Sequence, residues 1–144
     1  MDHLAIMHKH FMNKVLSGEK TVESRWSKDR RSPYGKIQTG DTIYFKFSSG
    51  PVAAKADVSK VDSFSIVDDR KGVEIYVDAH YKALGLETLS RTKQFLHNNQ
   101  SKYYVTFITL KKVRKIEDFN INKDGFGIRA SWIVIEDINK LKRK

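Results

Sequence analysis

Two cations and a carboxylate lie within six residues near the N-terminus of this sequence. Lys20, Glu23 and Arg25 follow Gly18 in the segment 17–26. A lysine supplies a point charge for a phosphate, and it can act as a base or nucleophile when burial lowers its pKa. A glutamate can accept a hydrogen bond from the exocyclic amine of cytosine or adenine, and arginine offers a planar fork of donors for phosphate or a base edge. Together the three side chains suit the recognition of a nucleotide.

An extended strand would place Thr21, Glu23 and Arg25 on one face, because strand side chains alternate. Glu23 and Arg25 could then pair with each other or converge on one ligand. The plain alternative is a surface ion pair, with Lys20 as a cation favoured by the dipole of the preceding helix. Exposed pairs of that kind contribute little to stability. The residues alone leave both interpretations open.

Apolar periodicity predicts the elements that must position these charges. In chain order we expect a strand near 4–7, a helix over 8–17, strands over 21–26, 42–47 and 52–65, helices over about 68–86 and 87–98, and a strand from 103 that continues to 116. The expected apolar stripes are Phe11, Val15 and Leu16 in the first helix and Val73, Val77 and Tyr81 in the second. Gly18 should end the first helix in the left-handed conformation.

The order of these elements predicts the fold class. Strands outnumber helices and follow one another in sequence, whereas a doubly wound sheet would alternate strictly between strand and helix. We therefore expect an α+β protein, a small mixed β-barrel with two or three helices packed outside it. All of residues 1–144 should form one domain, with a charged C-terminal tail from about residue 137 that extends freely or forms a frayed helix.

One motif resembles a known family. Gly18-x-Lys20-x-x-Glu23-x-Arg25 is similar to the GxKxxExR signature of the ASCH domain. The setting agrees, because an apolar strand and helix precede the motif, Gly40-Asp41 opens the next strand, and Tyr104–Phe107 forms a late strand. The resemblance covers roughly residues 4–116. It implies a PUA-like β-barrel that binds RNA, with the signature residues lining a cleft beside the first helix.

One branch of that family consists of amidohydrolases that act on acetylcytidine with a Lys, a Thr and a Glu. Lys20 would be the lysine, but Glu23 stands where the branch has its threonine. The catalytic glutamate would fall near Leu84, with Glu74 and Glu87 as the nearby carboxylates. The departure puts amidohydrolase activity in doubt. Whether the protein is an enzyme stays open, and a hydrolase of a modified nucleoside or a ribonuclease would use Lys20 and Glu23 as its catalytic residues.

Further residues complete the expected site. The predicted ligand- or RNA-binding residues are Lys20, Thr21, Glu23, Arg25, Trp26, Lys46 and Arg129. Residues 126–132 are expected to fold back over the cleft, with Arg129 facing it. Trp26, Tyr34 and Trp132 could stack on bases or pack in the core. The segments 28–31 and 111–115 could follow a phosphate backbone or form a solvated basic surface.

The amino-acid composition restricts the kinds of ligand, cofactor and partner that the protein is expected to bind. A net charge of +10 favours a polyanion, so RNA or a nucleotide is the expected partner, although a Lys-rich surface or a protein-interaction module would carry the same charge. The absence of cysteine excludes disulfides and thiolate chemistry. No cofactor is expected, and the spacing of His3, His8 and His10 predicts no metal site. No apolar run suits a membrane span or a signal peptide, so the expected location is cytoplasmic.

Overall fold

The computed structural model describes residues 1–122 and 131–143. Its elements are β1 (Asp2–Met7), α1 (Lys9–Ser17), β2 (Val22–Ser27), β3 (Thr42–Phe47), β4 (Val52–Ser65), α2 (Arg70–Ala79), α3 (Ser90–Asn98), β5 (Tyr104–Phe119), β6 (Trp132–Ile135) and a 3-10 helix η1 (Ile138–Leu141). The order from β1 to β5 agrees with the predicted one, and β6 and η1 follow as two further elements. No helix of the described residues is long and apolar enough to cross a membrane.

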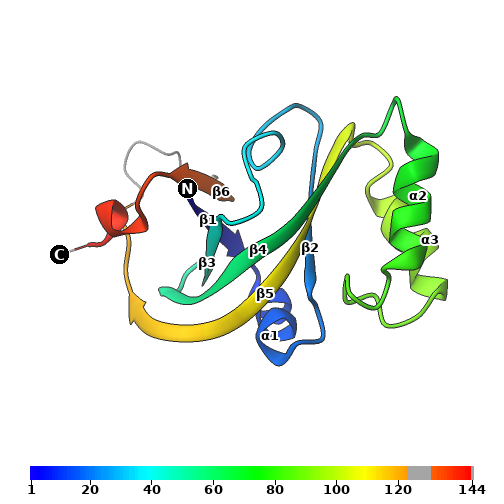
Figure 1. Ribbon diagram of the computed structural model, residues 1–144. Coiled ribbons are helices and arrows are strands. Elements are labelled where there is room, and N and C mark those ends of the chain that lie inside the picture. The colour runs from blue at the N-terminus through cyan, green and yellow to red at the C-terminus, as the bar shows by residue number, and fades with distance from the viewer. Residues whose placement is uncertain (123–130, 144) are drawn as a thin grey trace.

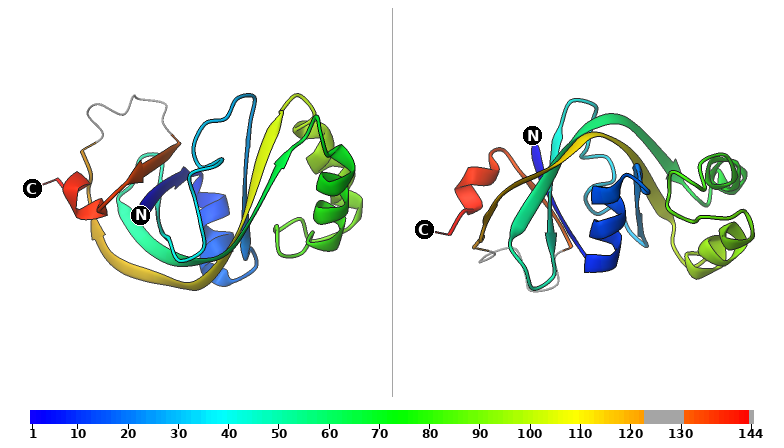
Figure 2. Two further views of the ribbon diagram at one scale, coloured as in Figure 1. Left: turned by 45° about the horizontal axis from the view of Figure 1, so that its top comes forward. Right: turned by 90° about the horizontal axis from the view of Figure 1, so that it is seen from below.

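The strands form one curled sheet with the order β2-β5-β4-β3-β1-β6. β1 pairs with β3 in parallel, and the other neighbours are antiparallel. The long strands β4 and β5 curve through the whole molecule, and α2 and α3 lie side by side where β4 ends and β5 begins (Figure 1). Figure 2 shows the same arrangement from two further sides, with α1 close to the curled sheet. The predicted α+β fold, a small mixed β-barrel with helices packed outside it, is confirmed.

The barrel is open between its two edge strands, β2 and β6, and Arg25 reaches across this opening. Its Nη1 donates to the carbonyl of Ser131 at 3.3 Å and its Nη2 to that of Ile6 at 3.3 Å. Its guanidinium lies 5.0 Å from the centre of the Trp132 ring on β6. A single side chain therefore joins β2 to the opposite edge of the sheet.

The core fills both sides of the curled sheet. One cluster packs Met12 and Val15 of α1 against Phe45 of β3 and Ile108 of β5. A second packs α2 and the α2–α3 connection against the sheet around Phe107. The prediction for α1 was partly wrong, because Met12 is buried while Phe11 is 48% exposed. Phe11 is thus free to take part in a surface site.

The helix predicted over 68–86 is shorter than expected. Asp69 caps its N-terminus by accepting from the backbone N–H of Gly72 at 2.9 Å, and the helix ends at Ala79. Because Tyr81 lies beyond the last turn, Tyr76 takes its place on the buried face. The next residues form turns rather than helix, with Gly85 at a φ of +81°. These turns become one wall of the cavity described below.

Residues 137–143 pack against the rest of the molecule instead of extending as a tail, and Ile138–Leu141 form a short 3-10 helix. Ile138 and Leu141 are buried against Leu4 and Val52. Asp2 accepts a hydrogen bond from the backbone N–H of Ile138 at 2.8 Å. The sequence prediction rested on the high charge of this segment and overlooked its two apolar residues. Ile138 and Leu141 are three positions apart and form the buried face of a short 3-10 helix.

Candidate functional site

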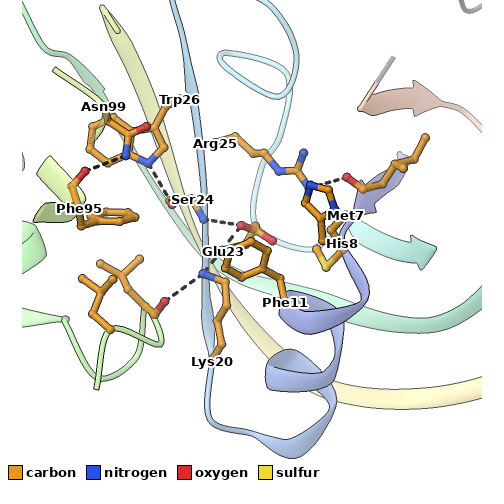
Figure 3. A pocket seen from close by; sticks show the side chains of 13 residues that line it. Met7, His8, Phe11, Lys20, Glu23, Ser24, Arg25, Trp26, Phe95 and Asn99 are labelled. Carbon is orange, nitrogen blue, oxygen red and sulfur yellow. Dashed lines mark hydrogen bonds and ion pairs between the residues drawn. The ribbon is translucent and has the colours of Figure 1, made fainter. Parts of the chain in front are cut away.

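A cavity of about 360 Å³ lies between α1, β2, the turn after α2, and α3. Figure 3 shows that side chains of β2 form its floor, with α1 on one side and α3 on the other. Its lining combines apolar and polar side chains: Ile6, Met7, Phe11, Trp26, Leu84, Leu86 and Phe95, with His8, Lys20, Glu23, Ser24, Arg25 and Asn99. The volume falls in the lower part of the range of small-molecule sites, about 300–1,000 Å³.

The turn after α1 places Lys20 in this cavity. Gly18 takes a φ of +84° and ends the helix, so the chain reverses and the backbone N–H of Lys20 reaches the carbonyl of Lys14 at 3.0 Å. The side chain of Lys20 is almost fully buried. Its Nζ donates to the carbonyl of Leu84 at 3.1 Å and lies 3.9 Å from Glu23 Oε1.

Burial lowers the pKa of Lys20, because a desolvated ammonium is costly. The carboxylate of Glu23 opposes that shift, whereas the positive charges of Arg25 and Lys14 add to it. A lysine with a lowered pKa holds its proton less firmly. Lys20 can therefore serve as a charged anchor or, once neutral, as a base.

Glu23 is buried beside Lys20, and a single oxygen makes its contacts with the protein. Oε1 accepts from the backbone N–H of Ser24 at 2.9 Å and pairs with Lys20. Among the described residues Oε2 makes no hydrogen bond or ion pair. The ion-pair partner of Glu23 is thus Lys20 rather than Arg25, whose guanidinium is occupied at the barrel opening. Figure 3 marks the contacts of Glu23 with Lys20 and Ser24 by dashed lines.

Trp26 forms the aromatic part of the floor. Its ring centre lies 5.5 Å from that of Phe95 on α3 and 5.8 Å from that of Phe107, in edge-to-face arrangements. Its Nε1 donates to Ser24 Oγ at 3.0 Å. The ring is thus fixed from three sides while still facing the cavity.

The structure separates two predicted site residues from the cavity. Thr21 precedes β2 and is exposed, because its backbone N–H and that of Val22 are held by the carbonyl of Ala83. Lys46 is buried, and its Nζ donates to the carbonyls of Phe47 and Ser48 at 2.8 and 3.4 Å. The register shift between Phe45 and Lys46 interrupts the alternation of β3, which explains why a lysine points inward. Arg129 lies outside the described residues.

Sequence reasoning missed part of the lining. His8, Phe95 and Asn99 were not expected at the site, and Phe11 was assigned to the core. For α3 the sequence offered no direct signal, because its position opposite β2 depends on long-range packing. For Phe11 the sequence did hold a signal. The next residue, Met12, is also apolar and occupies the buried position of α1 that was assigned to Phe11.

The other carboxylates considered for catalysis lie outside the cavity. Glu87 is exposed and pairs with Lys14 at 3.3 Å, and Glu74 is exposed on α2. Glu23 is therefore the only carboxylate that lines the cavity among residues 1–122 and 131–143. Those residues also contain no cluster of His, Asp and Glu side chains that could hold a metal ion.

The fold is that of ASCH domain proteins. The crystal structure of ASCH from Zymomonas mobilis matches 99% of this chain and 96% of its own, with a TM-score of 0.68 at 15% sequence identity. A point mutant of that protein matches 99% of both chains with a TM-score of 0.65 at 15% identity. No family model matches the sequence, and no curated protein matches it significantly. The ASCH-type fold implied by residues 18–25 is thus confirmed.

Proposed function

We propose that the cavity over β2 binds one base of RNA or of a nucleotide. The observation that carries the proposal is the Lys20–Glu23 pair buried among aromatic rings. Glu23 Oε1 is held by the protein, so Oε2 is the atom available to accept from an exocyclic amine. Trp26, Phe11 and Phe95 supply apolar and aromatic surface against which a base can pack.

Charge supports the same ligand. The chain carries a net charge of +10, and Lys20 and Arg25 both line the cavity. The phosphate of a nucleotide would meet positive charge at this surface. Lys20 is a cation, and Arg25 keeps N–H groups beyond the two that it donates to Ser131 and Ile6. The ASCH-type fold agrees with a role in nucleic-acid binding, as the resemblance of residues 18–25 implies.

A second candidate is hydrolysis of a modified nucleoside, and the burial of Lys20, which lowers the pKa of its ammonium, is the observation that favours it. A neutral Lys20 could accept a proton from an attacking water molecule, with Glu23 beside it to stabilise the ammonium that results. Glu74 and Glu87 supply no second carboxylate to the cavity. Binding therefore has the stronger support.

Titration calorimetry with cytidine, adenosine and uridine tests the proposal. We expect cytidine and adenosine to bind more tightly than uridine, which has no exocyclic amine. Glu23→Gln should reduce that difference several-fold, because a neutral acceptor makes a weaker hydrogen bond than a carboxylate. Lys20→Met should weaken all three, while Lys9→Met, which removes an exposed lysine of α1, should weaken none. If no nucleoside and no single-stranded RNA binds the wild-type protein, the proposal is wrong.

A further inference from the structure

A second, smaller cavity of about 40 Å³ adjoins the first. Arg25 and Trp26 line both cavities, and the small one is closed by the loop after β2 and by Trp132. A water molecule takes about 30 Å³ in the liquid, so the small cavity has room for a phosphate oxygen and none for a base. A ligand that extends from the large cavity past Arg25 would therefore place its next polar group here.

Aromatic rings continue beyond this small cavity. Tyr34, on the loop after β2, lies with its ring centre 4.9 Å from that of Tyr104 at the start of β5. The Arg30 guanidinium lies 5.6 Å from the centre of the Tyr104 ring. Tyr34 and Tyr104 are only partly buried, so ring surface remains accessible. Rings beside arginines form the kind of surface on which bases of single strands stack.

The same loop is strongly cationic. Residues 28–36 contain four cationic side chains and one carboxylate: Lys28, Arg30, Arg31 and Lys36 against Asp29. Both oxygens of Asp29 are engaged by Arg31, through Nε at 2.6 Å and Nη2 at 2.9 Å. Arg31 therefore keeps Nη1 for another acceptor, and the loop retains an excess of positive charge.

We infer that the ligand of the large cavity is one nucleotide within a single strand of RNA, and that the loop 28–34 binds its neighbour. The adjoining phosphodiester lies over Arg25 and the small cavity, within reach of Arg30 and Arg31. The next base stacks on Tyr34. The inference rests on the proposed function and names its substrate class, because a free nucleoside would leave this second surface unused.

Titration calorimetry with two probes distinguishes binding in the large cavity from binding on the loop 28–34. Cytidine reaches only the large cavity, whereas a five-nucleotide RNA with one central cytidine among uridines reaches both. We expect the pentamer to bind wild type at least 10-fold more tightly than cytidine. Arg30→Ala/Arg31→Ala should cost the pentamer about 10-fold in affinity and reduce the slope of log K against log salt by about 0.7 for each lost phosphate contact. Binding of cytidine should not change.

Tyr34→Ala tests the stacking step, and it should weaken the pentamer about 5-fold or more without changing cytidine binding, because stacking on one base contributes about 1–3 kcal/mol. Lys140→Ala/Arg143→Ala is the matched control, since it removes two exposed cations from the C-terminal segment, away from the loop 28–34. Equal losses in the control and in the arginine variant would overturn the inference, as would equal losses of cytidine and pentamer in the loop variants. If cytidine and the pentamer bind wild type equally, the inference alone fails. If neither binds, the proposed function fails with it.

Discussion

Arg25 and Trp132 connect the two edges of the barrel. The guanidinium of Arg25 on β2 lies 5.0 Å from the centre of the Trp132 ring on β6, and it donates to the carbonyls of Ile6 and Ser131. Trp132 is itself fixed, because its Nε1 donates to His3 Nδ1 at 3.0 Å in the core. Arg25 therefore has a structural role as well as a place at the site, since it closes the barrel and lines the cavity at once.

Arg25→Met should therefore destabilise the protein by about 2 kcal/mol, because it removes charged hydrogen bonds to two carbonyls and a cation–π contact. Arg25→Lys should recover less than half, since an ammonium cannot reproduce the planar fork. Arg31→Met is the matched control and should change stability by less than about 0.5 kcal/mol, because Arg31 is exposed and its ion pair with Asp29 lies at the surface. Urea denaturation measures all three. Losses of the same size for Arg25→Met and Arg31→Met would contradict the bridging role.

The buried Lys20 gives a prediction that is independent of any ligand. In a 13C-lysine NMR titration, one signal should titrate below the ordinary lysine value of 10.5, and Lys20→Met should remove that signal. Glu23→Gln should lower this pKa further, because the carboxylate favours the ammonium. Arg25→Met should raise it, because the guanidinium opposes the ammonium. A Lys20 pKa that rises in Glu23→Gln would refute the assigned pairing.

His3 makes stability depend on pH. It is fully buried between two partners: Trp132 donates to Nδ1, so Nε2 carries the proton and donates to Asp41 Oδ2 at 2.8 Å. Burial lowers the pKa of His3 below its ordinary 6.5, more strongly than the neighbouring Asp41 carboxylate raises it. The N-terminal ammonium also faces this group, 3.5 Å from Asp41.

Below pH 6.5 the unfolded chain therefore binds a proton at His3 that the folded protein resists, so the free energy of unfolding should fall as the pH drops from 6.5 towards the lowered pKa. Thermal denaturation between pH 7.5 and 5 measures this fall. His3→Gln should flatten the profile, whereas His10→Gln, at an exposed position of α1, should leave it unchanged. A wild-type protein equally stable throughout that range would refute the assignment.

The local residue pattern was sufficient to predict the helices and strands, whereas the arrangement of the site depends on tertiary contacts. The alternation of Val52, Ala54, Ala56 and Val58 identified β4, and all four are fully buried. Gly18 correctly marked the end of α1, because its left-handed backbone is a local property. These features depend only on neighbouring residues, so the sequence is sufficient for them.

The partners of the charged residues depend on contacts distant in sequence. Lys20 finds the carbonyl of Leu84, 64 residues away, and Arg25 finds that of Ser131, 106 residues away. Both acceptors are backbone carbonyls, which every residue type carries, so no residue pattern points to them. Strand alternation alone suggested that Glu23 and Arg25 could pair with each other. In the structure Glu23 pairs with Lys20 and Arg25 donates to backbone carbonyls, and alternation cannot predict either contact.

The C-terminal segment offers the last test, because its sequence predicts a tail and the structure places it in the core. Ile138→Ala should destabilise the protein by about 2–4 kcal/mol, since it leaves a cavity beside Leu4 and Val52. Lys140→Ala, on the exposed side of the same 3-10 helix, should change stability by less than about 0.5 kcal/mol. Urea denaturation measures the free energy of unfolding of both variants and so tests whether Ile138 is buried. If Ile138→Ala is as mild as Lys140→Ala, residues 138–141 form the solvated tail that their charge predicts.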